Sequence, residues 1–333
     1  MSCYDREQEY MTKRIYSTAT AAAIGLSVWI AGAIAQDYPN RPIRIIVPFA
    51  AGGGTDVLAR LLGQRIHESF GQPVLVENRS GAGGNIGAEL VVKSAPDGYT
   101  LLMSTASTAV NRTLYPKITF DVRQHLIAVS QMASSVIVLT THPSVPARSV
   151  KELVALSAKT RGGLNFGSNG VGTTSHLSGV LLNQMARISL NHIPYKGVAP
   201  AMTALLGGEV EIGFPAVISA APQIRNNRIR GLAVTTKQKS SVLPELPTLD
   251  SMYPGFDINN WFMLFAPAGT PQAIVGRLHA EVVKSLQHPD VKTFMVREGA
   301  DVVGNSPAEA AAFVSQEVEK FAKIIRSAGI TPE

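Results

Sequence analysis

Short apolar segments alternate with amphipathic ones through the first half of the chain. Four runs rich in apolar or β-branched residues and bounded by Gly, Pro or Asp predict strands at residues 43–49, 74–78, 100–104 and 135–140. Apolar positions at helical spacing predict helices from Asp56 to Ile66 and over residues 85–94. Strands that alternate with helices predict a mostly parallel sheet with helices on both faces.

The second half of the chain repeats this alternation. The predicted strands are residues 164–167, 189–193, 210–214 and 231–235, and the predicted helices are residues 149–158, 175–186, 201–206 and 221–226. Ser149 is the expected N-cap of the first of these helices, with Glu152 at the capping-box position. An aromatic strand at 261–265 and two helices at 272–287 and 307–328 end the chain.

The aromatic strand decides how the two halves are connected. If it returns to the first sheet, the chain crosses between two lobes twice, near 130–138 and near 256–265, and two crossings form a hinge. The predicted fold is therefore α/β with two lobes. Residues 37–135 plus 260–333 form lobe 1, and residues 136–259 form lobe 2.

The N-terminal region has the pattern of an export signal. Lys13 and Arg14 precede an uncharged apolar run at 21–34 that ends in Ala33-Ile34-Ala35, an A-x-A cleavage pattern. This run is shorter than the roughly 20 residues that a spanning helix needs. Residues 1–35 are thus predicted to be a signal segment that is cleaved after Ala35. The acidic residues within the first ten are unlike a signal peptide, so we expect translation to start at Met11.

Composition then narrows the function. The only cysteine is Cys3, inside the predicted signal segment, so the mature chain has no disulfide, cysteine nucleophile or thiolate metal site. The net charge of +6 comes without a long Lys/Arg cluster and with few aromatic residues, which argues against nucleic acid and suits an anionic solute. The roughly 300 residues that remain exceed the usual size of a single core, so two domains are expected.

The glycine-rich segment from Pro48 to Asp56 lies between a predicted strand and a predicted helix. Backbone N–H groups and the positive end of the helix there form a site for a small anion. A nucleotide-binding P-loop would need Lys-Ser/Thr after its last glycine, and Thr55-Asp56 stands there instead. Asp56 is expected to be the N-cap of its helix.

Two further glycine-rich segments precede helices. At 80–87, Ile86 replaces the third glycine of the dinucleotide fingerprint, and the segment is either a flexible turn or a place where a ligand approaches the backbone. At 165–176, the hydroxyl groups of Ser168, Thr173 and Thr174 can donate to a carboxylate.

Residues that would indicate catalysis are missing from these loops. A nucleophile elbow around Ser168 needs glycine where Phe166 stands, so a hydrolase is disfavoured. His176 and His192 have no neighbours at metal-ligand spacing and are expected to be structural. Lys196 is either a solvated loop residue or a cation near the cleft. We expect no metal, no cofactor and no enzymatic activity.

Several motifs together resemble those of a known family. They are Pro48-Phe-x-x-Gly-Gly-x-x-Asp56, Glu77-Asn-Arg-x-Gly-Ala-Gly-Gly-Asn-Ile-Gly87, Ala95-Pro-Asp-Gly-Tyr-Thr-Leu-Leu102, His192-x-Pro-Tyr-Lys-Gly197 and Ala266-Pro-Ala-Gly-Thr-Pro271. In this order and spacing, over nearly all of residues 37–333, the chain resembles the Bug (TctC-type) extracytoplasmic solute-binding proteins of tripartite tricarboxylate transporters.

The resemblance implies a type II periplasmic-binding-protein fold and capture of a small carboxylate, aliphatic or aromatic, in the periplasm. It implies membrane permease subunits as partners, and a monomeric receptor is expected. Carried over by position, and together with Phe49 and Pro215, the implied ligand-binding residues come from both lobes. They are Ala51, Gly52, Gly53, Asp56, Asn85, Ser104 and Thr105 in lobe 1, and Ser168, Gly172, Thr173, Tyr195 and Lys196 in lobe 2.

The sequence departs from the family pattern at three places. Asn111-Arg112 stands where Asn-Pro is expected, and residues 121–129 are poorer in Pro and Phe than usual. Phe214-Pro215-Ala216 stands where the family often offers a small polar residue or Asp. Because Pro215 has neither an N–H nor a side-chain hydrogen-bonding group, we predict an organic acid without an ammonium group.

Two other functions compete with transport. A sensor that presents its ligand to a signalling receptor would use the same lobes, and the sequence does not separate it from a transport receptor. A secreted hydrolase is the less favoured alternative, because a nucleophile motif, paired carboxylates and a metal cluster are not found in the sequence.

Overall fold

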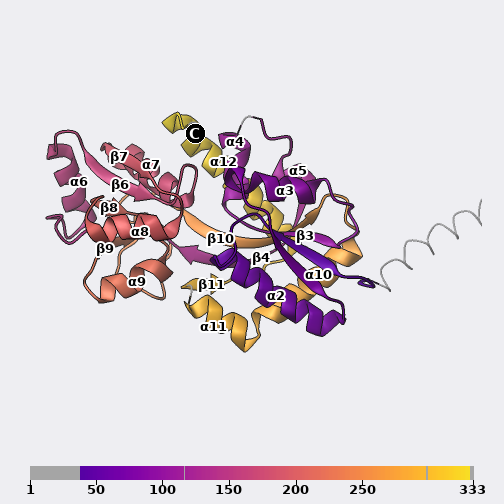
Figure 1. The fold of residues 1–333 in the computed structure, drawn as a ribbon. Helices are drawn as coiled ribbons and strands as arrows, with labels where there is room; N and C mark the ends of the chain where they lie inside the picture. Colours follow the sequence, from indigo (N-terminus) through magenta and orange to yellow (C-terminus); the bar gives the residue numbers. More distant parts are fainter. Residues whose placement is uncertain (1–37, 116, 298, 331–333) are drawn as a thin grey trace, which may run out of the picture. The chain divides into compact units, whose positions relative to one another are not determined.

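A computed structural model describes residues 38–115, 117–297 and 299–330. The predicted signal segment and its cleavage site lie outside the described residues. The chain from Pro42 onward forms one compact unit, and it holds two sheets with helices packed against them (Figure 1). Among the described helices, none combines the length and hydropathy needed to cross a membrane.

The first sheet has six strands in the order β11-β4-β10-β3-β1-β2. Their bounds are Ile43–Val47 for β1, Val74–Asn78 for β2, Thr100–Thr105 for β3, Leu126–Val136 for β4, Asn259–Pro267 for β10 and Ala300–Val302 for β11. Strand β1 pairs in parallel with β2 and β3, whereas β10 pairs antiparallel with β3 and β4. The first three predicted strands are therefore confirmed.

The second sheet has five strands in the order β7-β6-β8-β5-β9. Their bounds are Val138–Thr141 for β5, Leu164–Ser168 for β6, Leu190–Pro194 for β7, Ile212–Gly213 for β8 and Arg230–Val234 for β9. Strand β6 pairs in parallel with β7 and β8, and β5 runs antiparallel to β8 and β9. In each sheet most strands run in one direction. The antiparallel pairs all involve β4, β5 or β10, the strands that adjoin the crossings.

The chain crosses between the sheets twice, as the aromatic strand predicted. Strand β4 of the first sheet ends at Val136 and β5 of the second begins at Val138, so Ile137 alone separates them. After β9 the chain returns through β10, which contains the aromatic residues. The predicted strand at 135–140 is wrong in one respect, because it joins parts of two strands that belong to different sheets. The lobe boundaries predicted from the sequence remain a prediction.

Helices pack against both sheets. Their bounds are Gly54–Phe70 for α2, Asn85–Val92 for α3, Ser107–Leu114 for α4, Val122–His125 for α5, Val150–Lys159 for α6, Thr174–Ala186 for α7, Val198–Gly207 for α8, Val217–Arg225 for α9, Gln272–Leu286 for α10, Pro289–Arg297 for α11 and Pro307–Ala328 for α12. A 3-10 turn, η1, spans Ala82–Gly84. Helices α4, α5 and α11 were not predicted, and α9 begins four residues before its predicted start.

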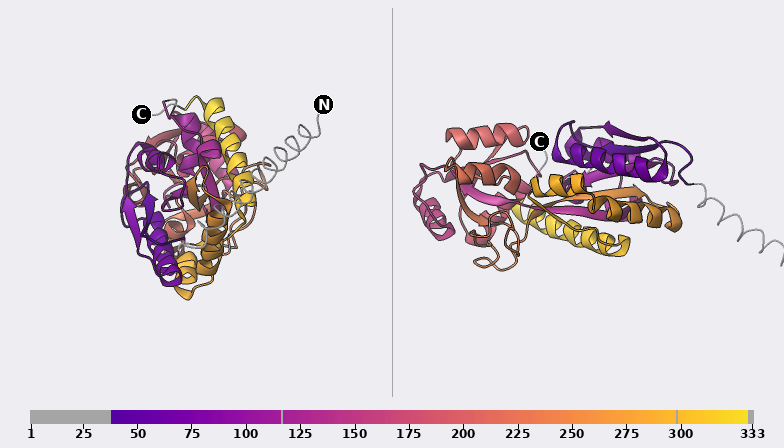
Figure 2. Two further views of the ribbon diagram at one scale, coloured as in Figure 1. Left: turned by 90° about the vertical axis from the view of Figure 1, so that its right-hand side faces the viewer. Right: turned by 90° about the horizontal axis from the view of Figure 1, so that it is seen from below.

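The long C-terminal helix α12 contacts the returning strand β10. Helix α12 lies along the first sheet (Figure 2) and begins with a capping box formed by Ser306 and Glu309. The fully buried Trp261 of β10 donates from Nε1 to Oε2 of Glu317 at 3.0 Å. Burial raises the pKa of Glu317, although Lys320 and Trp261 both contact its carboxylate. Trp261 thereby links the crossing strand β10 to helix α12.

Candidate functional site

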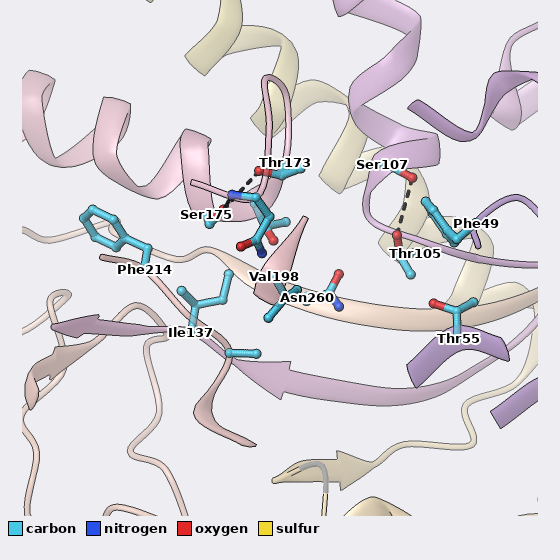
Figure 3. Close-up of a pocket in the computed structure, with 13 residues that line it drawn as sticks. Phe49, Thr55, Thr105, Ser107, Ile137, Thr173, Ser175, Val198, Phe214 and Asn260 are labelled. Atoms are coloured by element: carbon cyan, nitrogen blue, oxygen red, sulfur yellow. Dashed lines mark hydrogen bonds between the residues drawn. The ribbon is translucent and has the colours of Figure 1, made fainter. Parts of the chain in front are cut away.

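A cavity of about 250 Å³ lies where strands of both sheets end (Figure 3). Phe49 follows β1, Thr105 ends β3, Asn169 follows β6 and Phe214 follows β8. Because parallel strands in one sheet end at a common edge, loops at this edge converge on a shared crevice. The cavity therefore stands at the position where open α/β sheets bind ligands.

A second cavity of about 370 Å³ adjoins the first, since both are lined by Phe49, Ser107, Asn169 and Thr173. Its walls are rich in glycine from two loops, 80–84 and 170–172. At Gly172, whose φ is +76°, an added Cβ would lie 2.1 Å from Leu114 of α4. Helix α4 therefore packs closely against the loop at 170–172, and the loop at 80–84 lines the same cavity.

Five described helices begin at the first cavity, namely α2, α4, α7, α8 and α9. Their first turns or N-caps contribute the lining residues Thr55, Ser107, Thr173, Thr174, Ser175, Val198 and Ala216. Thr173 caps α7 by accepting from the N–H of His176, whereas the other four helices have no side-chain cap. Uncapped first-turn N–H groups and the positive ends of helix dipoles both favour an anion.

The lining of both cavities carries no charged side chain among the described residues. Serine, threonine, asparagine and Tyr115 supply the polar side chains, and no described set of three or more His, Cys, Asp or Glu side chains could hold a metal ion. Two pairs of lining hydroxyls are hydrogen bonded, Thr105 with Ser107 at 3.4 Å and Thr173 with Ser175 at 3.0 Å (Figure 3). Hydroxyl and amide groups can donate to an anion without placing a fixed charge beside it.

The loop before α2 is held by the carboxylate of Asp56, which is only 3% exposed. This carboxylate accepts from the N–H of Gly52 at 2.9 Å, from Asn78 at 3.0 Å and from Arg60 at 3.0 Å. Burial alone would raise the pKa of Asp56, but these hydrogen bonds outweigh it and lower the pKa. Asp56 is not the N-cap that we predicted, because Gly53 occupies that position and Asp56 reaches back from the first turn.

The loop before α7 is held by a neutral cluster. The hydroxyl of Ser168 lies 2.6 Å from Nε2 of His192, whose ring stacks on His176 at 3.8 Å between centroids. Nδ1 of His176 accepts from the N–H of Gly172 at 3.1 Å. Burial lowers the pKa of His176 to about 3, helped by His192, and lowers the pKa of His192 to about 4. Both rings are uncharged at neutral pH, so the structural role predicted for them fits their surroundings.

The Ser168–His192 pair does not offer a nucleophile. Ser168 is 1% exposed and lines neither cavity, and its Oγ also accepts from the N–H of Gly170 at 3.1 Å. A nucleophile must reach its substrate and needs an accessible base. This pair therefore fixes the loop that surrounds it.

The predicted binding residues fall into three groups. Phe49, Thr105, Gly172 and Thr173 line the two cavities, and Pro215 lines a small adjoining one. Four are buried behind the lining, namely Asp56, Asn85, Ser104 and Ser168. Five others line none of these cavities, namely the exposed Ala51, Gly52, Gly53 and Lys196 and the half-buried Tyr195. For all three groups, the part that these residues play in ligand binding stays a prediction.

Some lining residues were not predicted. They include Thr55, Ser107, Ile137, Asn169, Val198, Phe214 and Asn260 in the first cavity, and Asn111 and Tyr115 in the second. Ile137 and Asn260 lie in the two crossings between the sheets, which were predicted, but no local motif indicates that these two side chains line a cavity. Asn169 and Thr55 lie inside predicted loops, and the uncharged polar character of those loops was a usable signal.

Two α/β lobes, two crossings and a cavity at the strand ends define a solute-binding protein of the periplasmic type, and solved structures agree. The structure described as "R. palustris Rpa4515 with adipate" is 34% identical with a TM-score of 0.79, covering 89% of this chain and all of that one. MatC from Rhodopseudomonas palustris with bound malate is 30% identical with a TM-score of 0.75, covering 86% of this chain and 100% of that one. The periplasmic binding protein BugD is 33% identical with a TM-score of 0.76, covering 89% and 100%.

The chain belongs to the tripartite tricarboxylate transporter family receptors, whose family model, TctC, matches residues 58–330. It is 37% identical over 319 residues to protein BugT of Bordetella pertussis, covering 94% of this chain and 98% of that one. The resemblance seen in the sequence and the two-lobed α/β fold are thereby confirmed. The family consists of periplasmic solute receptors and not of enzymes.

Proposed function

We propose that this protein captures a small organic acid between its two lobes by the acid's carboxylate and delivers it to a tripartite tricarboxylate transporter. The observation that carries the proposal is the convergence of five helix N-termini, four of them without a side-chain cap, on one uncharged cavity. Each N-terminus presents about half a positive charge and free N–H donors to an anion. A carboxylate matches both in charge and in size.

Thr55 gives this proposal a specific donor. Its side chain lines the cavity at the start of α2, is only 8% exposed, and makes no hydrogen bond that the described residues supply. A hydroxyl that faces the cavity and has no partner among the described residues is available to donate to a bound carboxylate oxygen. The related proteins with adipate and with malate support a carboxylate as the group recognised.

The position of the cavity supports closure around the ligand. Ile137 lies in the first crossing and Asn260 in the second, and both line the first cavity (Figure 3). We propose that these crossings are the hinge between lobe 1, residues 37–135 plus 260–333, and lobe 2, residues 136–259. A ligand that touches both crossings and both lobes binds the closed form better than the open one, which is what favours closure.

We further propose that the exported protein is cleaved after Ala35, acts in the periplasm as a monomer, and hands its ligand to the permease subunits of the transporter. Family membership supports the last of these steps. Sequencing the N-terminus of protein purified from the periplasm tests the cleavage, and a start well before Gln36 would contradict it.

The decisive experiment is a thermal-shift screen of that exported protein against aliphatic and aromatic carboxylates, each paired with its uncharged amide. An acid present at 100 times its Kd adds about 2.7 kcal/mol of stability, while its amide leaves the melting temperature unchanged. Thr55→Val should weaken binding of the identified acid about 10-fold, equivalent to about 1.4 kcal/mol. The matched control Thr203→Val removes an exposed hydroxyl of α8 that lines neither cavity. If no acid shifts the melting temperature, the proposal is wrong.

A further inference from the structure

We infer that the end of the second sheet opposite the cavity is a docking surface for a membrane that contains anionic phospholipids. We call this surface the basic end. It consists of six exposed residues, Arg148, Lys151, Lys159, Arg161, Arg187 and Arg228. The inference goes beyond the proposed function, because the surface lies away from the cavity and does not depend on which acid binds there.

The positive charge of the protein is concentrated in the part that forms the second sheet. Residues 136–259 contain 11 Lys and Arg against 6 Asp and Glu, which gives a net charge of +5. Residues 37–135 and 260–333 together contain 16 basic and 15 acidic residues, which gives a net charge of +1. An anionic partner is therefore attracted mainly to the second sheet and its helices.

The two parts also differ in how their charges are paired. Among the described residues, ion pairs such as Arg44 with Glu77 and Arg123 with Asp121 occur only outside residues 136–259. Residues 136–259 are all described, so none of their basic side chains is paired with a carboxylate. Unpaired charges of one sign repel each other, and their field extends into the solvent. An external anionic surface would supply the missing opposite charge.

The topology of the second sheet gathers cations that are far apart in the sequence. Strands β6, β7, β8 and β9 begin at one end of this sheet, and β5 ends there. Arg161, Arg187 and Arg228 come two or three residues before β6, β7 and β9. Because β7 and β9 are the two edge strands, these cations are spread over about 20 Å. The opposite end of the sheet leads to Asn169 and Phe214, which line the cavity.

Helix α6 extends the basic end. The helix lies at the end of the second sheet that is far from the first sheet (Figures 1 and 2). Arg230, at the start of β9, holds the segment before α6 by donating to the carbonyl groups of Val145 and Ala147 at 3.0 and 2.8 Å. Lys151 and Lys159, near the two ends of α6, are both exposed. The helix therefore adds two cations beside the starts of the strands.

The acidic residues at this end do not cancel its charge. They are Glu152 in the first turn of α6 and Glu209 and Glu211 before and at the start of β8. Glu152 accepts from the N–H of Arg148 at 2.7 Å, and Glu211 accepts from the N–H of Asn165 at 2.8 Å. Two of the three carboxylates thus bind the backbone, and the six cations of the basic end outnumber all three.

The composition of the basic end favours a lipid surface over a protein partner. A protein interface has a core of apolar and aromatic side chains. The exposed large apolar residues within 136–259 are Ile193, Val198 and Met252, and none of them lies on α6 or before a strand. An anionic membrane needs no apolar core, because each Lys or Arg near its surface strengthens binding about 5-fold.

The first test is cosedimentation of the exported protein with vesicles of phosphatidylglycerol and phosphatidylcholine in equal parts, compared with vesicles of phosphatidylcholine alone. We expect binding to the anionic vesicles only, and loss of that binding at about 0.5 M salt, where charges are screened within roughly 4 Å. Equal binding to both vesicles, or binding to neither, would overturn the inference. Binding only when permease subunits are added to phosphatidylcholine vesicles would also overturn it, since the partner would then be a protein. None of these outcomes bears on the capture of an acid, which the thermal-shift screen tests separately.

The second test removes three charges from the basic end with the triple variant Arg161→Gln, Arg187→Gln and Arg228→Gln. Its affinity for anionic vesicles should fall on the order of 100-fold, because three contributions of about 5-fold each are lost. None of the three side chains lines a cavity, so the variant should bind the acid found in the screen as the unchanged protein does. Circular dichroism melts establish that the variant folds.

The matched control removes the same charge elsewhere. Lys93, Lys117 and Lys292 are exposed and lie outside residues 136–259, and all three are replaced by Gln. This variant should lose less than about 3-fold in affinity for the anionic vesicles, since only the overall attraction is weakened. Equal losses in the two triple variants would show that net charge alone, and not the basic end, governs binding.

Discussion

The two loops that lead into α2 and α7 face the same cavity but are held by opposite kinds of chemistry. The loop at 48–53 is fixed by a carboxylate, since Asp56 binds the N–H of Gly52 and pairs with Arg60. The loop at 169–173 is fixed by uncharged groups, with Ser168 against His192 and His176 against Gly172. Equivalent loops can thus be positioned by an ion pair or by a neutral network, and the two should respond differently to acid and to salt.

The largest expected effect is acid destabilisation of the histidine cluster. In the unfolded chain both histidines have a pKa near 6.5, whereas in the fold His176 titrates near 3 and His192 near 4. Well above pH 6.5 both histidines are neutral in the folded and unfolded states, so their contribution to stability is fully present. As the pH falls from 6.5 towards 4, the unfolded chain takes up protons that the fold refuses, so stability falls. The expected loss at pH 4.5 is on the order of 4 kcal/mol for the pair.

Urea unfolding between pH 7.5 and 4.5 measures this loss. A double variant, His176→Gln with His192→Gln, cannot titrate, so its stability should change much less over the same range even if it is lower at pH 7.5. If the free energy of unfolding falls equally with pH in both proteins, the histidine cluster does not govern the response to acid.

The middle effect concerns the charged loop. Asp56→Ala removes the acceptor of three partly buried hydrogen bonds and should destabilise the protein by about 3 kcal/mol in urea unfolding at pH 7.5. Asp56→Asn keeps the shape and one acceptor oxygen, so it should cost about half as much. Equal costs for the two variants would mean that the carboxylate is not what holds the loop.

The smallest expected effect is a difference between the two loops in how the stability cost of a substitution depends on salt. Arg60 is 52% exposed in its side chain, so Arg60→Ala should cost about 1 kcal/mol or less, and that cost should shrink as salt is raised to 1 M. Ser168→Ala in the neutral cluster should lower the free energy of unfolding by about 1 kcal/mol both at low salt and at 1 M salt. A cost of Arg60→Ala that does not depend on salt would contradict the ionic account of the first loop.

The sequence predicted the regular parts of the fold well, because their patterns are local. Strands β1, β2 and β3 and helix α12 follow from apolar runs and periodic positions that glycine, proline or a capping box delimit. Strand β4 was recognised only at its end, since its buried interior includes Ser130 and Gln131 and does not read as an apolar run. Helix α4 was missed because Ser107, Thr108 and Thr113 interrupt its apolar pattern.

The sequence predicted which loops form the site but not which of their side chains line the cavity. The glycine-rich loops at 48–56 and 165–176 were found, and Phe49, Thr105 and Thr173 line the cavity. Which side chain in a loop faces the cavity depends on tertiary contacts, and so Asp56 and Ser168 lie behind the lining while Thr55 and Asn169 form it. Asn260 became a lining residue only because β10 returns beside β4.

The absence of titratable side chains from the described lining of the first cavity has a consequence for how the receptor responds to its surroundings. Peptide dipoles and hydroxyl groups keep their polarity across the whole range of pH in which the fold is stable. The occupancy of the cavity therefore follows the ionisation of the solute itself. On the proposed function, we expect a weak acid to be retained while it is an anion and released once it takes up its own proton.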